Sequence, residues 1–131
     1  MSRQYSLKQI REVWINAYLN GETDWLAYLE TPSFFVKHNA ELVSKASQIS
    51  SIDRGFARFP GKRTTDVEFS ETLKQWQEHK NWATVEGSAR IKRNGEVVSQ
   101  CEFFELWLIA DDRWQIASLC MEDSDQVSPP R

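Results

Sequence analysis

The chain has few of the residues that build disulfide frameworks and metal centres. It contains two cysteines and two histidines in 131 residues. Cys101 and Cys120 are too few for a disulfide framework or a cysteine-based metal site, so we interpret both as buried thiols. His38 and His79 are well separated and have no acidic cluster beside them. The sequence therefore predicts no metal site and no cofactor.

Glycine-rich loops and long apolar runs are also missing. Gly55 and Gly61 are isolated and do not form a phosphate loop between a strand and a helix. Ser44 and Ser88 lack a base with an orienting partner, so nucleophilic catalysis has no support. No stretch approaches the roughly 20 apolar residues of a membrane span. The N-terminus has no basic segment followed by an apolar one, so we expect no signal peptide. We therefore expect a cytoplasmic protein without a membrane partner.

The charge balance is close to neutral. Sixteen Lys and Arg residues face nineteen Asp and Glu residues, which gives a formal net charge of −3. A mildly acidic domain has no general attraction for nucleic acid. Because acidic residues alternate with the basic clusters, we interpret those clusters as solvated surface and expect no nucleic-acid partner.

What the chain does have is apolar and aromatic side chains. Hydrophobic residues make up 40% of the sequence, charged residues 27%, and six residues are tryptophan. This composition is typical of a globular protein, and the length fits one domain. We predict a single domain over residues 1–122. The remaining residues, 123–131, are acidic and then proline-containing, which predicts a loose tail.

Helix signals dominate the first half of the chain. Ser6, with Gln9 three residues later, forms a capping box before a broad apolar stripe, which predicts a helix over residues 7–20 that ends at Gly21. A short second helix is expected over residues 24–30. Residues 33–38 are predicted to form a strand, followed by a turn at Asn39 and a third helix over residues 45–52 that Ser44 caps. Residues 53–62 are expected to be irregular.

Strand signals dominate the second half. Residues 63–79 have strand character at Val67 and Phe69, and clearer strands are expected over residues 82–92, 97–109 and 114–121. The pair Asn94-Gly95 favours a two-residue turn, because both positions of a type I′ turn need a positive φ. We take Asp111-Asp112 as the second such turn. These turns fix the predicted register of the last three strands.

That register divides the last three strands into two faces. The face expected to cover the helices carries small residues on one strand and larger ones beside it, namely Ala83, Val85, Gly87, Ala89, Phe104, Leu106, Leu108, Ala117, Leu119 and Met121. The opposite face carries an aromatic band with charged edges, which is typical of a protein–protein interface. We therefore predict a homodimer interface made of Trp82, Phe103, Trp107, Ile109, Trp114 and Ile116. The alternative is that the tail or residues 53–62 cover this face.

The order of elements resembles the NTF2-like fold, which is also called cystatin-like. Residues 34–45 (FFVKHNAELVSK) are similar to the strand, turn and third-helix entry of its small SnoaL-like and DUF4440 members. Residues 104–117 (FELWLIADDRWQIA) resemble their closing hairpin. The resemblance implies an α+β fold in which a curved antiparallel sheet wraps around the N-terminal helices and leaves a conical pocket.

The ketosteroid isomerases of this family provide a test for catalysis. They carry a Tyr donor on the first helix, an Asp base on the first strand and an Asp donor on the penultimate strand. The matching positions here are Trp14, Lys37 and Phe104. None of these side chains can supply the required group, so that chemistry is not expected.

The predicted ligand pocket combines both halves of the chain. Its expected lining residues are Trp14, Tyr18, Trp76, Val85, Gln100, Glu102, Phe104, Leu106, Leu119 and Met121. Glu102 is a catalytic candidate, because a carboxyl group among apolar side chains can act as a general acid or base. The alternative is that it lies in water at the rim or pairs with Lys74 or Arg90. His38 is the other candidate, against a simple turn role. Trp14 and Tyr18 either line the pocket or pack the core.

Three functions remain open on the sequence alone. The first is an NTF2-like domain that binds a small apolar molecule in its cavity and forms a homodimer. The second is a SnoaL-like lyase, isomerase or hydrolase that uses Glu102 or His38 as acid or base. The third is a protein-interaction module that docks another protein on its aromatic sheet face.

Overall fold

The structure, a computed structural model, describes residues 5–58 and 67–124. The elements occur in the order α1 (Leu7–Asn20), α2 (Thr23–Leu29), β1 (Glu30–His38), β2 (Glu41–Ser44), α3 (Lys45–Arg58), β3 (Val67–Glu78), β4 (Trp82–Arg93), β5 (Glu96–Ala110) and β6 (Arg113–Asp123). Most predicted bounds agree within a few residues. The exceptions are α3, which continues through residues expected to be irregular, and β1, which begins three residues early. Predictions were also made for residues 59–66, which include the start of the strand expected over 63–79, and for residues 125–131. Both segments lie outside the described part.

The predicted caps of the first helix are confirmed. The Ser6 side chain accepts a hydrogen bond from the Gln9 backbone, and the Gln9 side chain accepts one from the Ser6 backbone. This capping box satisfies two of the N–H groups that a helix start leaves unpaired. Gly21 ends α1 with a φ of 71°, a conformation that favours glycine. Ser44 likewise accepts a hydrogen bond from the backbone of Ser47 at the start of α3.

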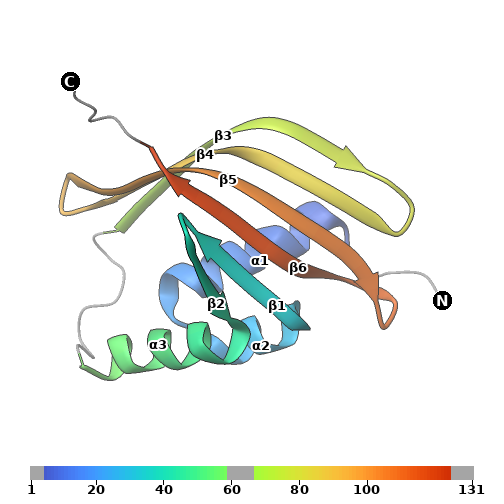
Figure 1. Cartoon of the computed structure of the whole chain (residues 1–131), viewed down its shortest axis with the longest axis horizontal. Coiled ribbons are helices and arrows are strands. Elements are labelled where there is room, and N and C mark those ends of the chain that lie inside the picture. The colour runs from blue at the N-terminus through green and yellow to red at the C-terminus, as the bar shows by residue number, and fades with distance from the viewer. Residues whose placement is uncertain (1–4, 59–66, 125–131) are drawn as a thin grey trace.

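The six strands of the described part form one sheet in the order β2-β1-β6-β5-β4-β3. β1 runs parallel to β6, and every other neighbouring pair is antiparallel. The sheet curves without closing, and the three helices lie on its concave side (Figure 1). The predicted α+β architecture, a curved sheet wrapped around N-terminal helices, is confirmed.

Both predicted two-residue turns are present. Asn94 and Gly95 have φ values of 55° and 84°, and Asp111 and Asp112 have values of 55° and 61°. The predicted register, however, holds only near each turn. Lys92 pairs with Val97, but the next residue of β4, Ile91, pairs with Ser99. Val98 is therefore unpaired, and every later β4–β5 pair is shifted by one residue. Each such bulge adds one residue to one strand of a pair.

A second bulge shifts the β5–β6 pairing in the same way. Trp107 pairs with Ile116 as predicted, but Leu106 pairs with Ser118 and leaves Ala117 without a partner. A shift of one residue moves a side chain to the opposite face of the sheet. The predicted faces of β5 are therefore exchanged. Its inward residues are Cys101, Phe103, Glu105, Trp107 and Ile109, while Phe104, Leu106 and Leu108 point outward.

The core lies between the helices and this inward face. Its largest fully buried side chains include Trp107, Phe34, Leu7, Leu26, Leu29 and Ile116. The small residues of β4 face inward as predicted, and Ala83 and Val85 are fully buried. Gly87 allows β3 to approach closely, because a Cβ atom at that position would lie 2.3 Å from the Thr72 carbonyl oxygen. A side chain at Gly87 would therefore force the two strands apart.

Candidate functional site

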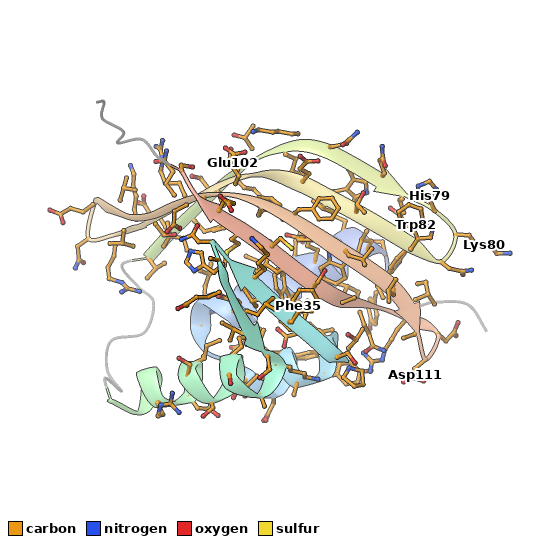
Figure 2. The ribbon with its side chains drawn as sticks, viewed as in Figure 1. Phe35, His79, Lys80, Trp82, Glu102 and Asp111 are labelled. Carbon is orange, nitrogen blue, oxygen red and sulfur yellow. The ribbon has the colours of Figure 1, made fainter. Side chains whose placement is uncertain are left out.

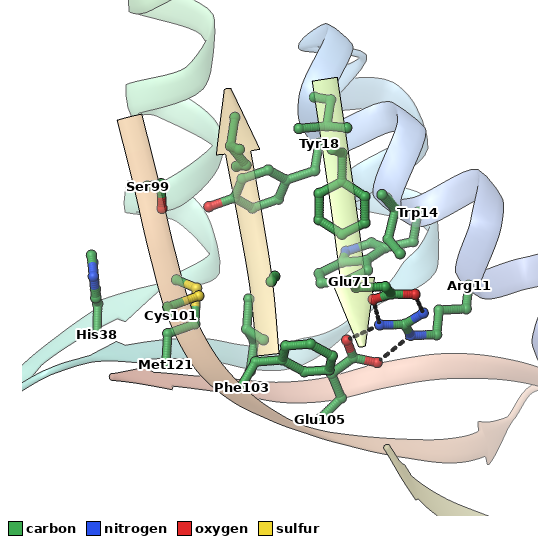
Figure 3. A pocket seen from close by; sticks show the side chains of 16 residues that line it. Arg11, Trp14, Tyr18, His38, Glu71, Ser99, Cys101, Phe103, Glu105 and Met121 are labelled. Atoms are coloured by element: carbon green, nitrogen blue, oxygen red, sulfur yellow. Dashed lines mark hydrogen bonds and ion pairs between the residues drawn. The ribbon is translucent and has the colours of Figure 1, made fainter. Parts of the chain in front are cut away.

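A cavity of about 210 Å³ lies between α1 and the concave face of the sheet (Figure 3). Four aromatic side chains line it, namely Trp14, Tyr18, Phe69 and Phe103. Aliphatic residues and Met121 add to the apolar wall, namely Ile15, Leu19, Ala89, Ile91 and Leu119. The polar contributions come from Arg11, His38, Glu71, Ser99, Cys101 and Glu105. The cavity is thus mostly apolar with a small number of polar groups, which is typical of a small-molecule site.

One end of the cavity holds an ionic triad made of Arg11, Glu71 and Glu105. Arg11 Nε lies 2.7 Å from Glu105 Oε1, and Arg11 Nη2 lies 2.9 Å from Glu105 Oε2. The guanidinium also donates to both Glu71 oxygens at 2.8 Å. Both carboxylates are therefore bound in the bidentate geometry that makes Arg–carboxylate pairs strong. Figure 3 shows Arg11 between the two carboxylates.

The triad is largely buried, and a hydrogen bond from Trp107 supports it. Arg11 is 5% exposed and Glu105 is 2% exposed, whereas the Glu71 side chain is 21% exposed. Trp107 donates its indole N–H to Glu105 Oε1 at 2.8 Å. Burial on its own lowers the pKa of Arg11, but its hydrogen bonds and charge interactions with Glu71 and Glu105 raise that pKa above its usual range. Arg11 is therefore a permanent cation at this site.

Tyr18 and Cys101 place ionisable groups elsewhere in the cavity. Figure 3 shows the Tyr18 hydroxyl directed across the cavity toward the Ser99 side. No hydrogen-bond partner for this hydroxyl occurs among the residues that the structure describes. Burial raises the pKa of Tyr18, and the nearby charge of Glu30 raises it further. Burial likewise raises the pKa of Cys101, with contributions from Asp123 and Glu102. Both groups are therefore neutral at pH 7.

Behind Trp14 lies a second buried carboxyl group, Glu30. Its Oε2 accepts hydrogen bonds from Trp14 Nε1 and Gln48 Nε2, both at 3.1 Å. Glu30 Oε1 and Gln48 Oε1 are buried and have no hydrogen-bond partner within residues 5–58 and 67–124. Burial raises the pKa of Glu30, although these two donors and the charge of Lys45 oppose the shift. A proton on Glu30 Oε1 would make that atom a hydrogen-bond donor.

His38 lies at the far end of the cavity from Arg11 (Figure 3). Its Nε2 atom is 2.8 Å from Asp123 Oδ1, and Asn39 Nδ2 donates to Asp123 Oδ2 at 3.0 Å. The hydrogen bond with His38 and then that with Asn39 lower the pKa of Asp123. Asp123, predicted to begin a loose tail, instead ends β6 and is held by these contacts. His38 is thus a cavity residue with a fixed carboxylate partner.

The structure brings four of the predicted pocket residues to the cavity, namely Trp14, Tyr18, Leu119 and Met121. Val85 packs in the core. Trp76 lines a neighbouring groove that shares Arg11, Ile15, Phe69 and Glu71 with the cavity. The prediction was wrong for Phe104, Leu106 and Gln100, which were expected to line the pocket. The bulge at Val98 turns them away from the cavity. Glu102 also points outward, where it pairs with Lys74 at 2.6 Å. This is the surface pairing that the sequence left as the alternative to an acid–base role.

The predicted interface residues are displaced by the same shift. Trp107, Trp114, Ile116 and Phe103 are buried inside the chain, so they are not available to a partner. Ile109 packs against this core. Trp82 alone of the six is on the outer face, where its ring stacks on His79 with centroids 4.1 Å apart. Figure 2 shows these two side chains together at the turn between β3 and β4.

The triad was not predicted from the sequence. Its signals were nonetheless present in the chain. Arg11 falls on the apolar stripe of α1 between Leu7 and Trp14, and Glu105 interrupts an aromatic strand. A charged residue inside an apolar pattern is rarely buried without a partner. Pairing these two residues would have required the correct face of β5.

The described residues contain no group of three or more His, Cys, Asp and Glu side chains arranged to hold a metal ion. None of the helices within the described ranges is long and apolar enough to cross a membrane.

Comparisons with known proteins bear on the fold. No protein-family model and no curated protein matches the chain. An NTF2-like protein from Cytophaga hutchinsonii matches with a TM-score of 0.70 and 12% identity, over 95% of this chain and 100% of that one. A protein of unknown function with a cystatin-like fold from Nostoc punctiforme matches with a TM-score of 0.71 and 8% identity, over 97% and 98%.

A ketosteroid isomerase-like protein from Erwinia carotovora atroseptica is similar as well. Its TM-score is 0.65 at 14% identity, and the match covers 94% of this chain and 95% of that one. Identities this low establish the fold alone, and one fold serves many functions. The chain therefore has the NTF2-like, cystatin-like fold that its sequence predicted.

Proposed function

We propose that this chain binds a small, mostly apolar molecule in the cavity between α1 and the sheet. The observation that carries the proposal is an apolar cavity of about 210 Å³ with few polar groups in its wall. An engineered apolar cavity of roughly 150 Å³ accommodates benzene. The cavity here is therefore suited to a compact molecule built around a single ring or a short alkyl chain.

The polar groups would orient such a ligand. The Tyr18 hydroxyl points into the cavity and is free to donate or accept one hydrogen bond. The triad is fixed by α1, β3 and β5 and has its own hydrogen bonds in place. A rigid wall of this kind reduces the cost of ordering the site when a ligand binds.

Thermal unfolding with a panel of small aromatic and aliphatic compounds tests the proposal. A ligand present at about 100 times its Kd stabilises the folded state by about 2.7 kcal/mol, which raises Tm by several degrees. Ala89→Phe fills the cavity and should remove the shift. Ser88→Phe adds the same side chain to the opposite face of β4 and should retain it. No shift with any compound, or an equal shift in Ala89→Phe, would contradict cavity binding.

A catalytic role is a second candidate, and it rests on His38. This histidine lines the cavity and has the Asp123 carboxylate 2.8 Å from its Nε2 atom, an arrangement that can orient a general base. His38→Gln should then abolish turnover of a bound ligand and leave its affinity within about threefold. Equal turnover in the variant would exclude His38 as the base.

We also propose that the chain forms a homodimer through the outer face of its sheet. An apolar patch on this outer face supports the proposal. Of its residues, Trp82 alone belonged to the predicted interface. The patch consists of Phe35, Trp82, Phe104, Leu106 and Leu108, and Figure 2 labels its first two members. Phe35 and Leu106 lie on either side of Ser118, because both pair with it in the sheet. Exposed apolar patches of this kind mark interaction surfaces.

A further inference from the structure

The charges around the cavity do not cancel. Arg11 is the one permanent cation among the sixteen lining residues, whereas Glu71 and Glu105 both contribute carboxylates. With these three groups ionised, the triad has a net charge of −1. His38 adds no unpaired positive charge, because it lies against Asp123. A partly buried site with one uncompensated negative charge is electrostatically suited to a cation.

The excess negative charge is best assigned to Glu71. Glu105 is the more deeply buried of the two carboxylates and receives a second donor from Trp107, so it is the fixed partner of Arg11. Among the residues that the structure describes, Glu71 is bound by Arg11 alone, and each of its oxygens accepts a single hydrogen bond. A carboxylate oxygen can accept a further bond. Glu71 can therefore bind an incoming N–H group without losing Arg11.

The aromatic lining favours a cation in a second, independent way. The faces of Trp, Tyr and Phe rings attract positive charge. The cavity already contains one such contact, because Arg11 Cζ lies 5.5 Å from the centroid of the Phe103 ring. Three further rings line the cavity, namely Trp14, Tyr18 and Phe69. The same walls that accept an apolar body can therefore stabilise an ammonium group attached to it.

We infer that the cavity binds a small organic cation, namely a protonated amine on an aryl or alkyl body, whose ammonium group is bound by Glu71. This inference rests on the proposed function, because it requires a ligand in the cavity. It adds the chemical class of that ligand and the residue that recognises its charge.

Three molecules of nearly equal size and different charge test the inference. Calorimetric titration of the full chain at pH 7 would compare 2-phenylethylamine, 2-phenylethanol and phenylacetate. We expect the amine to bind at least about tenfold more tightly than the alcohol, and phenylacetate to bind most weakly. Glu71→Gln should reduce the preference for the amine over the alcohol to within about threefold.

Glu68→Gln provides the matched control. It removes the same charge from an exposed position on β3, three residues from Glu71 and outside the cavity wall. The amine preference should persist in this variant. A preference that falls equally in both variants would assign the effect to overall charge and overturn the role of Glu71. Circular dichroism of each variant verifies that it is folded.

Other outcomes separate this inference from the proposed function. Equal affinity for the amine and the alcohol in the wild type would overturn the cation inference and leave cavity binding intact. Tightest binding of phenylacetate would overturn it too, because the anion would then displace Glu71 from Arg11. Binding of none of the three molecules would also overturn it, and the broader compound panel with Ala89→Phe decides separately on the proposed function.

Discussion

Arg11 and Glu105 are 94 positions apart in the sequence and form a bidentate ion pair inside the chain, with 2.7 Å between Nε and Oε1. The pair joins α1 to a central strand of the sheet at the edge of the cavity. Because both groups are buried, neither can be removed without leaving the other poorly compensated. The same pair therefore shapes the site and holds the helix on the sheet.

Arg11→Met should lower the free energy of unfolding by about 3–5 kcal/mol, because it leaves Glu105 buried without its cation. Urea denaturation measures this loss. Lys8→Met is the matched control, since Lys8 lies on the same helix and its ion pair with Glu12 is exposed. Its effect should remain below about 1 kcal/mol. Similar losses in the two variants would contradict the structural role of Arg11.

Gly87→Ala should destabilise the fold by about 1–3 kcal/mol, because the new methyl group would overlap the β3 backbone at Thr72. Thermal or chemical denaturation measures the change. Ser88→Ala, one residue further along β4 and on its other face, should have little effect. A Gly87→Ala protein as stable as the wild type would show that β3 does not pack on Gly87 as closely as described.

Glu30 predicts a pH dependence of stability. Burial raises its folded-state pKa above the ordinary value of 4.5. The folded chain therefore retains this proton where the unfolded chain releases it. The associated stability is present below about pH 4.5 and is lost as the pH rises through the folded-state pKa. The facing groups are Trp14, Gln48, Lys45 and Tyr18, and none of them is a carboxyl group.

Glu30→Gln removes the titrating group while it retains a side chain of similar shape. Unfolding free energies measured by urea denaturation at several values between pH 4 and pH 8 should show a smaller decline with pH than in the wild type. Glu41→Gln, at an exposed position on β2, should leave the wild-type profile unchanged. If Glu30→Gln and the wild type decline in parallel, the buried carboxyl group is not the source of the dependence.

Phe104→Lys should convert a dimer into a folded monomer, because it places a charge in the outer apolar patch without touching the core. Sedimentation velocity measures the oligomeric state, and circular dichroism verifies the fold. Val97→Lys is the control, since Val97 is similarly exposed but lies beside the β4–β5 turn. A monomeric wild type, or a Phe104→Lys variant that remains dimeric, would contradict the proposed interface.

Local signals in the sequence were sufficient to predict most of the helices and strands and the fold. Ser6, Gly21 and Asn94-Gly95 each specify a local conformation, and the structure confirms all of them. Which face of β5 points inward could not be predicted, because it depends on two bulges that no glycine or turn residue marks in the sequence. Val98 and Ala117 are ordinary strand residues, so their unpaired positions follow from packing of the whole sheet.

Predicting the candidate site required the strand register, which is set by packing of the whole sheet, more than predicting the fold did. Trp14 and Tyr18 were found because a helix stripe can be recognised from its own spacing. Glu105 was assigned to the wrong face, and its partner Arg11 was not considered. Once Trp107 is placed in the core, the alternation of β5 brings Glu105 to the cavity and leaves Glu102 outside.

The bulge at Val98 also affects how this chain can vary during evolution. It lies between the hairpin tip and Ser99, the first residue of β5 that lines the cavity. Beyond the bulge, the orientation of β5 is fixed by Trp107 in the core and by its pairing with β6. Insertions and deletions between Arg93 and Val98 can therefore be accommodated at the tip, and homologues can differ there in length while they retain the same cavity wall.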